Sequence, residues 1–307
     1  MAKDLIIGGA SNYTWKELQY WVNSIKKTGF KGDIVLVATN ITNETVDKLT
    51  SEDVMVYGYG TKTDRGFENK TNNAPHVERF IFIWDYLRKN VDKYRFVTVT
   101  DTRDVIFQKD PTEFLEKNLI TKSIVCSSEG LAYQDEPWGS KNLLDTFGPF
   151  VYHEFKENMI YNVGTIAGYF EEVKDLLLKI FFQSVNRPIP IVDQAVFNFL
   201  ISLNPYKDEI LKTSNENDWA IQLGTTKVAV ESGAGDIGQI IKQNPEKMDE
   251  YLKVYQDIQP TIINGRVTNG YTEYYIVHQY DRVPGLKELI QKEYGDGECS
   301  EILTIIT

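Results

Sequence analysis

The sequence of residues 96–111 is Phe96-Val-Thr-Val-Thr-Asp101-Thr-Arg103-Asp104-Val-Ile-Phe-Gln-Lys-Asp110-Pro111. Its first five residues are apolar or β-branched, which predicts a buried strand. Charge begins where this strand ends, at Asp101, Arg103 and Asp104. In open α/β sheets, ligands bind beyond the carboxyl ends of the strands. Two carboxylates at such a position offer the oxygen ligands that a hard divalent cation prefers.

The residues after this acidic turn predict the start of a helix. Asp110 is suited to be the N-cap, Pro111 takes the first helical position, and Glu113 completes a capping box. The acidic turn is therefore expected to be held between a strand and a helix, as a metal site requires. The alternative interpretation is a strand-to-turn junction with a solvated ion pair, which is the commoner meaning of an isolated Asp-x-x-Asp.

This stretch resembles the metal-binding motif of GT-A glycosyltransferases, in which Asp-x-Asp at a strand end binds Mn²⁺ or Mg²⁺ and the ion holds the diphosphate of a nucleotide sugar. The longer pattern, Asp-x-Arg-Asp-Val-x-Phe-Gln-x-Asp-Pro, is similar to a branch found in microbial and viral polysaccharide-building enzymes. The chain departs from the common pattern in one respect. Aligned on Asp104, the first acid falls on Thr102, and Asp101 stands one place early. Asp104 is therefore predicted to be the firmer ligand, and Asp101 a ligand directly or through water.

Composition narrows the class of protein. The 307 residues suffice for one large α/β domain, or one domain with a small appendage, and the 42% hydrophobic content is ordinary for a globular protein. A net charge of -11 argues against general nucleic-acid binding, which needs a basic footprint. No apolar stretch approaches the roughly 18 residues of a membrane span.

The cysteines and the N-terminus bear on the compartment. Cys126 and Cys299 lie far apart and give neither metal-ligand spacing nor a disulfide framework, so a reducing compartment is expected. Lys3 and Asp4 precede only a short apolar run that ends at Ala10, which does not have the form of a signal peptide. Together these features predict a cytoplasmic location.

The N-terminal residues predict a β-α-β-α-β pattern of the nucleotide-binding kind. The strands are expected at 5–7, 33–38 and 54–57, with a helix introduced by the capping box of Thr14 and Glu17, and another helix over 43–49. Gly8-Gly9-Ala10 follows the first predicted strand. Glycines there would let the backbone approach a base or ribose, and a plain turn is the alternative. The dinucleotide-binding fingerprint is absent because its other glycines are missing.

Three arginines are candidates for contacts to the donor. Arg65 lies in residues 58–73, which are rich in Gly, Asn, Thr and Lys and predict a loop that is either solvated or able to reach phosphates. Arg79 lies on a helix that begins at Pro75. In the family that the chain resembles, an arginine on the helix before the metal strand contacts the donor phosphate, and Arg79 matches that placement; a surface arginine is the alternative. Arg103 belongs to the acidic turn.

The second half of the chain holds two more family-like segments. After a strand predicted over 123–127 and a loop-rich stretch over 129–150, residues 161–168 resemble the Asn-x-Gly segment that lines the sugar pocket of GT-A enzymes. Asn162 would supply a hydrogen-bond donor and acceptor, and Gly164 would allow close backbone approach. Asp193-Gln194 then begins an apolar helix, and this pair also resembles the family. The resemblance implies that Asp193 is a pocket carboxylate as well as a helix-start residue; a helix cap alone is the alternative.

The C-terminal third is less informative. Residues 204–260 give a weak pattern, with a strand-turn predicted over 219–226 on the acceptor side and a turn cluster over 233–238. Residues 275–282 run from a strand into a polar turn and resemble the segment whose histidine completes the metal site in many GT-A enzymes. His278 is thus the third predicted ligand, because imidazole accepts Mn²⁺ readily, although a lone histidine is more often structural.

These features predict an α/β protein with a GT-A-like mixed, mostly parallel central sheet flanked by helices. We expect a single domain over 1–307, with a nucleotide-binding half at 1–127 and an acceptor-binding half at 128–307. The predicted function is metal-dependent transfer of a hexosyl or pentosyl group from a nucleotide-diphosphate sugar, UDP being commonest in the superfamily, to a saccharide or glycan. Asp193 as general base implies inversion, and a retaining mechanism stays open.

Two other functions compete with this prediction. One is a sugar-phosphate nucleotidylyltransferase, a class that usually carries a basic residue in a glycine-rich segment after the first strand. Residues 8–12 lack that residue, which weighs against it. The other is a non-catalytic carbohydrate-binding protein, which would not need paired acids, a distant histidine and a pocket aspartate together.

Overall fold

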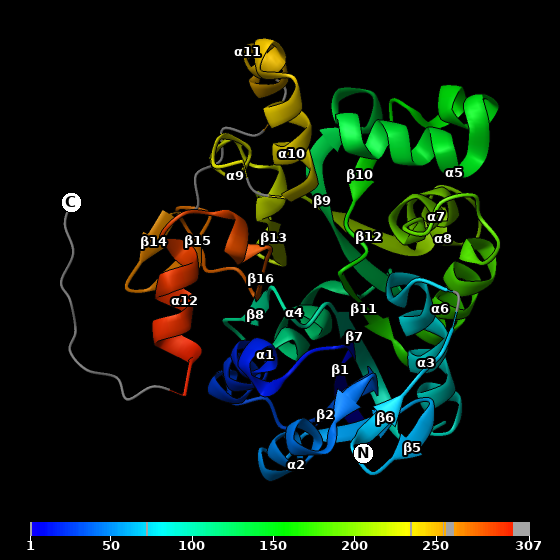
Figure 1. The fold of residues 1–307 in the computed structure, drawn as a ribbon, viewed down its shortest axis with the longest axis vertical. Helices are drawn as coiled ribbons and strands as arrows, with labels where there is room; N and C mark the ends of the chain where they lie inside the picture. Colours follow the sequence, from blue (N-terminus) through cyan, green and yellow to red (C-terminus); the bar gives the residue numbers. More distant parts are fainter. Residues whose placement is uncertain (1, 72, 234, 254, 256–260, 297–307) are drawn as a thin grey trace.

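The computed structural model describes residues 2–71, 73–233, 235–253, 255 and 261–296, and Figure 1 shows their arrangement. A mixed sheet runs through the molecule in the order β10-β9-β11-β7-β1-β2-β4, with β12 paired to β9. Its strands are β1 (Lys3–Ser11), β2 (Asp33–Thr39), β4 (Met55–Gly58), β7 (Tyr94–Thr100), β9 (Ile124–Ala132), β10 (Met159–Tyr161), β11 (Thr165–Tyr169) and β12 (Ile210–Thr213). The predicted fold class, a mixed α/β protein with a mostly parallel central sheet, is confirmed.

The centre of this sheet is parallel and buried on both faces. Strands β7, β1, β2 and β4 run in the same direction, whereas β11 runs against both β7 and β9. Along β1, Leu5 and Ile7 belong to one hydrophobic cluster and Ile6 belongs to another. Alternate residues of a strand point to opposite faces, so the unbroken apolar run reflects burial on both sides.

Helices cover both faces. Helices α3 (Pro75–Arg88), α6 (Phe170–Ser184) and α7 (Asp193–Ile201) contribute to the first cluster, and α1 (Trp15–Thr28), α2 (Asn43–Ser51) and α4 (Pro111–Asn118) contribute to the second. The remaining helices are α5 (Pro137–Phe155), α8 (Tyr206–Glu209), α9 (Lys227–Glu231), α10 (Gly235–Gln243), α11 (Met248–Leu252) and α12 (Leu286–Tyr294). Among the described residues, no helix has both the length and the apolar character to cross a membrane.

A second, smaller sheet places the polar residues of the C-terminal region. It has the order β13-β16-β8, formed by β13 (Ala220–Gln222), β16 (Ile276–His278) and β8 (Val105–Phe107). His278 pairs with Val105 on one side and with Gln222 on the other. Because Val105 directly follows Asp104, this register brings two residues 174 positions apart in the chain to the same place.

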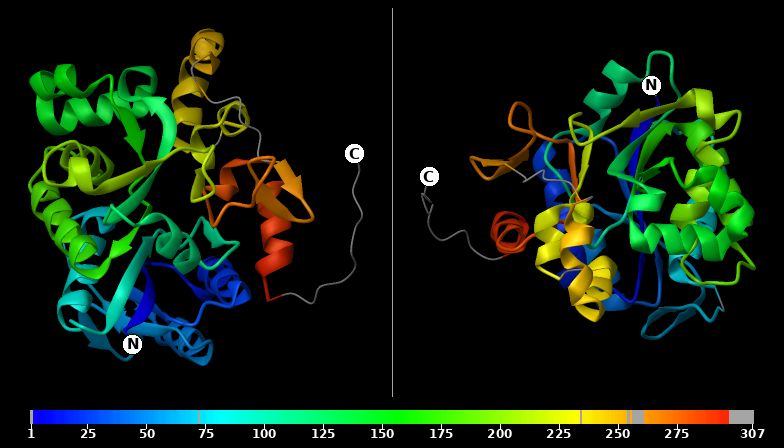
Figure 2. Two further views of the ribbon diagram at one scale, coloured as in Figure 1. Left: turned by 180° about the vertical axis from the view of Figure 1, so that it is seen from behind. Right: turned by 90° about the horizontal axis from the view of Figure 1, so that it is seen from above.

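A separate hairpin, β14 (Thr261–Ile263) and β15 (Arg266–Thr268), lies beside the small sheet. In Figures 1 and 2 this hairpin and α12 occupy the side of the molecule opposite α6 and α7.

The structure corrects several local predictions. The stretch 58–73 is not simply a loop, because β5 (Thr61–Thr63) and β6 (Gly66–Glu68) form a hairpin that pairs with β3 (Ile41–Thr42). The loop-rich interpretation of 129–150 is wrong, since β9 continues to Ala132 and α5 begins at Pro137. The predicted turn over 233–238 contains the start of α10, and residue 234 lies outside the described residues.

Candidate functional site

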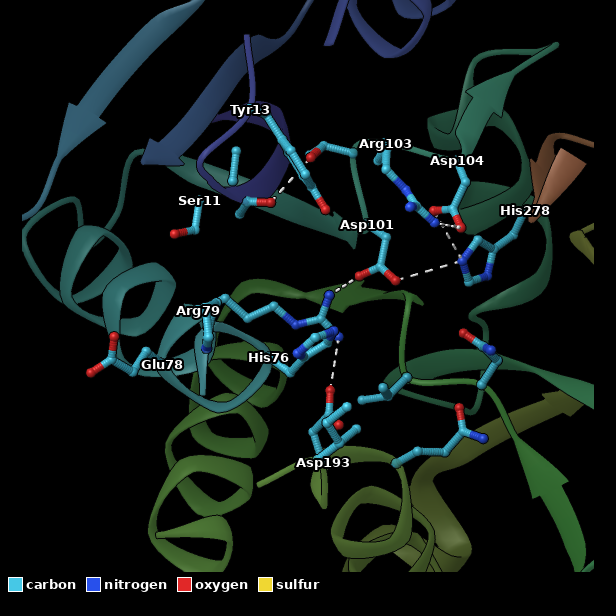
Figure 3. A pocket seen from close by; sticks show the side chains of 18 of the residues that line it. Ser11, Tyr13, His76, Glu78, Arg79, Asp101, Arg103, Asp104, Asp193 and His278 are labelled. Carbon is cyan, nitrogen blue, oxygen red and sulfur yellow. Dashed lines mark hydrogen bonds and ion pairs between the residues drawn. The ribbon is translucent and has the colours of Figure 1, made fainter. Parts of the chain in front are cut away.

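A cavity of about 410 Å³ opens beyond the carboxyl ends of β1 and β7, where ligands bind in open α/β sheets. Its walls come from β1, β2, α3, the turn after β7, the start of α5, the start of α7 and the turn after β16. Figure 3 shows the polar side chains that converge there. The predicted site residues that line the cavity are Gly9, Ala10, Arg79, Asp101, Arg103, Asp104, Asn162, Asp193 and His278.

The three predicted metal ligands meet in this cavity. Asp101 follows β7, Asp104 precedes β8, and His278 ends β16. His278 Nε2 lies 3.6 Å from Asp101 Oδ2 and 3.7 Å from Asp104 Oδ1. One ligand atom from each residue lies within 4.8 Å of the other two, a spacing that one metal ion can bridge.

A hydrogen-bond relay orients the His278 ring. Gln222 Nε2 donates to Thr165 Oγ1 at 2.9 Å, which leaves Gln222 Oε1 facing His278 Nδ1 at 2.7 Å. The network thus assigns the ring proton to Nδ1 and the lone pair to Nε2. Burial lowers the pKa of His278, so the ring is neutral at pH 7. A lone pair and two carboxylates then face one another with no proton between them, and a cation fits this donor set.

Burial alone would raise the pKa of Asp104. The positive charges nearby outweigh that effect: His278 when protonated, Arg103 and Arg282 together lower the pKa of Asp104. Arg103 Nη2 lies 3.3 Å from Asp104 Oδ2, and Arg282 Nη2 lies 4.0 Å from the same oxygen. Asp104 is therefore an anion in a buried position, as a metal ligand must be.

The turn that carries Gly164 fits closely against two of the ligands. A Cβ at position 164 would lie 2.8 Å from Asp101 Oδ2 and 2.8 Å from His278 Cε1. The Asp101 N–H donates to the Gly164 carbonyl at 3.0 Å. A glycine is needed here because a side chain would collide with these two residues; Gly164 itself does not line the cavity. The close backbone approach that was predicted for Gly164 is thus an approach to Asp101 and His278, two proposed metal ligands.

Asn162 holds the same turn in place. Its Oδ1 accepts from the Gly164 N–H at 2.7 Å, and its Nδ2 donates to Glu129 Oε1 at 2.7 Å. Glu129 is buried, and burial raises its pKa. Asn162 lines the cavity as predicted, but much of its hydrogen-bonding capacity is used within the protein.

Gly8 and Gly9 of β1 lack a Cβ, which leaves space for the side chains of neighbouring residues to pack against the strand. A Cβ at Gly8 would overlap the methyl group of Thr102, whose hydroxyl donates to the Gly9 carbonyl at 3.1 Å. A Cβ at Gly9 would lie 2.8 Å from the Cβ of Arg79. Gly8-Gly9-Ala10 lies inside β1, so the alternative interpretation of these residues as a plain turn is wrong. Gly8 does not line the cavity, and Thr102, which stands at the first acid position of the family pattern, packs against β1.

Arg79 contacts two of the predicted site carboxylates. Its Nη1 is in ion-pair contact with Asp101 Oδ1, and its Nη2 lies 3.1 Å from Asp193 Oδ2. Its Nε is buried and has no hydrogen-bond partner among the described residues. Arg79 lines the cavity, and its two ion pairs leave further N–H groups of the guanidinium available for an anionic ligand.

Asp193 is the first residue of α7, and its side chain is buried. The N-cap is Val192, which makes no side-chain capping bond. The Asp193 carboxylate instead points toward Arg79 (Figure 3), which is not the geometry of a simple helix cap.

Arg65 lies elsewhere. It occupies the turn between β5 and β6, is exposed, and does not line the cavity. Several lining or supporting residues were not predicted from the sequence: Tyr13, His76, Glu129, Trp138, Gln222 and Arg282. Arg282 could have been predicted from the sequence, because it follows the candidate ligand His278 by four residues and lies in the same polar turn. No sequence signal existed for Gln222, whose role depends on the pairing of β13 with β16.

No family model matches the chain, and no curated protein matches it by sequence. Solved structures do match it. The apo structure of the bifunctional glycosyltransferase WbbM aligns with a TM-score of 0.58 and 11% identity, covering 97% of this chain and 50% of that one. The chain shares the fold of the aligned part of this glycosyltransferase.

Two structures of the glycosyltransferase GlyE from Streptococcus pneumoniae TIGR4 align less closely. One has a TM-score of 0.48 and 13% identity, covering 91% of this chain and 55% of that one. The apo form has a TM-score of 0.47 and 11% identity with the same coverage, 91% and 55%. The chain thus spans about half the length of each of these proteins. At such low identity the likeness concerns the fold, and the chemistry must be argued from the site.

Proposed function

We propose that the protein is a metal-dependent glycosyltransferase of the GT-A type that uses a nucleotide-diphosphate sugar, with UDP as the expected nucleotide. One observation carries the proposal: Asp101, Asp104 and the oriented Nε2 of His278 converge from separate strands in a cavity beyond the sheet. The two carboxylates suit Mn²⁺ or Mg²⁺, and the imidazole nitrogen favours Mn²⁺ of the two, because Mg²⁺ prefers oxygen ligands throughout. Arg79, Arg103 and Arg282 surround this group with positive charge, which an anionic donor requires.

Each residue has a role in this proposal. The ion, held by Asp101, Asp104 and His278, would act as a Lewis acid on the departing diphosphate. Arg79 and Arg103 would neutralise the charge that a single divalent cation leaves, and a guanidinium can bind two phosphate oxygens at once. Asn162 and Gly164 would keep the sugar side of the pocket in shape, and Gly9 and Ala10 would line the nucleotide side. A contact from Arg65 to the donor remains a prediction, and it would require movement of the β5–β6 turn.

Asp193 is assigned as the general base. In the proposed step, the oxygen of an acceptor hydroxyl forms a bond to the anomeric carbon. The bond from that carbon to the diphosphate oxygen breaks, and its electron pair leaves with the nucleoside diphosphate. The hydroxyl proton passes to Asp193, and general base catalysis of this kind contributes roughly 10²–10⁴-fold in rate. A single displacement of this kind inverts the anomeric configuration.

The two halves of the chain would divide the substrates between them. Residues 1–127 would hold the nucleotide and residues 128–307 the saccharide or glycan acceptor, within one domain. The transferred group is a hexosyl or pentosyl unit. A cytoplasmic location, drawn from the cysteine pattern, completes the proposal.

A thermal-shift screen of nucleotide sugars, with and without Mn²⁺, tests this function. A ligand at about 100 times its dissociation constant adds roughly 2.7 kcal/mol to stability, which a melting curve resolves easily. We expect one class of nucleotide sugar to raise Tm only when Mn²⁺ is present, and Asp104→Ala to abolish the shift. Stabilisation by a nucleoside triphosphate with a sugar 1-phosphate would indicate a nucleotidylyltransferase instead. Stabilisation by glycans alone would indicate a carbohydrate-binding protein.

A further inference from the structure

The end of the cavity beside Asp193 differs in character from the metal end. Trp138, from the first turn of α5, is half-buried and lines the cavity. Ile191, two residues before Asp193, lines it as well and is 37% exposed. An exposed isoleucine and a half-buried tryptophan thus line the same cavity as the carboxylate assigned as the base. Neither side chain has a role in binding a metal or a diphosphate.

This apolar wall is built on buried polar contacts. The Glu136 carboxylate accepts from the Trp138 N–H at 3.1 Å and from the Gly139 N–H. One turn further along α5, Asn142 Nδ2 donates to the Ile191 carbonyl at 2.6 Å. The first bonds fix the start of α5, and the second ties the helix to the segment that carries Ile191. The Trp138 ring and the Ile191 side chain are therefore held on one frame.

Polar groups lie at the edge of the wall. Among the described residues, the indole N–H of Trp138 has no hydrogen-bond partner. Gln194, which also lines the cavity, is held by a side-chain hydrogen bond to the buried Glu129. A flat aromatic surface with donors and acceptors at its rim matches a sugar ring, which has an apolar face of C–H groups and a rim of hydroxyls.

We propose that Trp138, Ile191 and Gln194 form an acceptor subsite for a pyranose ring, which stacks on Trp138 and directs one hydroxyl toward Asp193. This inference rests on the proposed function and narrows its saccharide acceptor to a pyranose held by named residues, which excludes a protein hydroxyl or a lipid alcohol. An alkyl chain would need an apolar channel, but the wall passes directly into Asp193 and Gln194. A peptide would gain little binding free energy from one aromatic ring, that of Trp138, next to the charged Asp193.

The test separates acceptor binding from donor binding. Labelled protein with UDP and Mn²⁺ is applied to a glycan microarray that carries pyranose and furanose termini, and affinities for the best glycan are measured by calorimetry. We expect pyranose-terminated glycans to bind the parent, and Trp138→Ala to weaken them by about tenfold or more. Trp138→Phe keeps the stacking face and loses the N–H, so its affinity should fall between the two.

Two controls keep the result specific. Phe150→Ala removes an aromatic side chain beyond the kink of α5 at Gly148; Phe150 is 79% exposed and outside the cavity lining, so the change should leave glycan binding unchanged. Affinity for UDP with Mn²⁺ should be equal in the parent and both Trp138 variants. Equal glycan affinity in the parent and Trp138→Ala would overturn the proposed subsite. So would a parent protein that binds only furanose-terminated glycans, or that binds no glycan on the array. Loss of UDP binding from the parent would instead refute the proposed function.

Discussion

Arg79 Nη2 lies 3.1 Å from Asp193 Oδ2, and the same guanidinium is in ion-pair contact with Asp101. One arginine thus joins a proposed metal ligand to the proposed base. A metal ion at Asp101 and Asp104 would compete with Arg79 for the Asp101 carboxylate. A guanidinium released from Asp101 would still be held by Asp193, with donors free for a diphosphate.

The first prediction follows from this competition. Arg79→Gln removes the cation that neutralises Asp101, so Mn²⁺ alone should bind the variant at least as tightly as the parent. UDP in the presence of Mn²⁺ should bind more weakly, by about tenfold, because a charge-assisted contact worth ~1.5–3 kcal/mol is lost. Arg79→Lys should also weaken UDP binding, since an ammonium lacks the bidentate geometry. Calorimetry measures both ligands. Unchanged UDP affinity in both variants would mean that Arg79 does not face the donor.

The second prediction concerns Asp193. Asp193→Asn should keep donor binding and lose turnover by roughly 10²–10⁴-fold, because an amide cannot take the hydroxyl proton. The product of the parent enzyme should have inverted anomeric configuration by NMR. Retention of configuration would exclude Asp193 as the base of a single displacement. If Asp193→Asn instead lowered donor affinity and left the rate intact, the carboxylate would serve only to position Arg79.

The third prediction addresses the orientation of His278. Gln222→Leu removes the acceptor for the Nδ1 proton, and loss of such a partner typically costs about 10–100-fold in metal affinity. Gln222→Glu keeps an acceptor oxygen at the same place and should retain more of the affinity than the leucine variant does. Mn²⁺ titration compares them. Equal affinity in Gln222→Leu and the parent would place the metal away from His278.

The fourth prediction concerns Glu136, whose pKa burial raises to about 7. A pKa that is higher in the folded state gives a stabilising contribution that is complete below the unfolded value near 4.5 and is lost as pH rises through 7. This shift corresponds to about 3 kcal/mol in the unfolding free energy between pH 4.5 and 8. Glu136→Gln should flatten that part of the pH profile in urea unfolding. Asp135→Asn, at an exposed neighbouring carboxylate, is the matched control, and a slope shared by all three proteins would assign the effect to other groups.

Local signals in the sequence were enough for the core of the fold. Residues 96–100 and 33–38 form strands of mostly apolar or β-branched residues, as predicted. The Thr14–Glu17 capping box is present, and Asp110 caps α4 through the Thr112 N–H. Residues 129–150 were misjudged because Pro137 and the glycines suggested turns. In the structure Pro137 opens α5, and the buried Glu136 carboxylate caps it. Sequence alone does not reveal that burial.

For the candidate site, too, the residues with a local sequence signal were predicted and those that depend on tertiary packing were not. Asp101, Asp104 and His278 stood out because each adjoins a predicted strand and because their segments resemble a known metal site. The structure brings them together from strands of two different sheets, which the sequence did not predict. Gln222 and Glu129 did not stand out, because their partners lie 56 and 33 residues away and the contacts depend on tertiary packing. The Arg79–Asp193 pair spans 114 residues, so neither residue predicts the other.

Mn²⁺ binding tests the central claim most directly. The protein, with UDP present, is titrated with Mn²⁺ while electron paramagnetic resonance records the free ion. We expect one ion per chain in the parent and in Asp110→Asn, whose carboxylate lies outside the cavity lining. Asp104→Asn and His278→Ala should each lose that ion while their melting curves remain cooperative. Stoichiometric binding that survives in both of these variants, or no binding by the parent, would contradict the account.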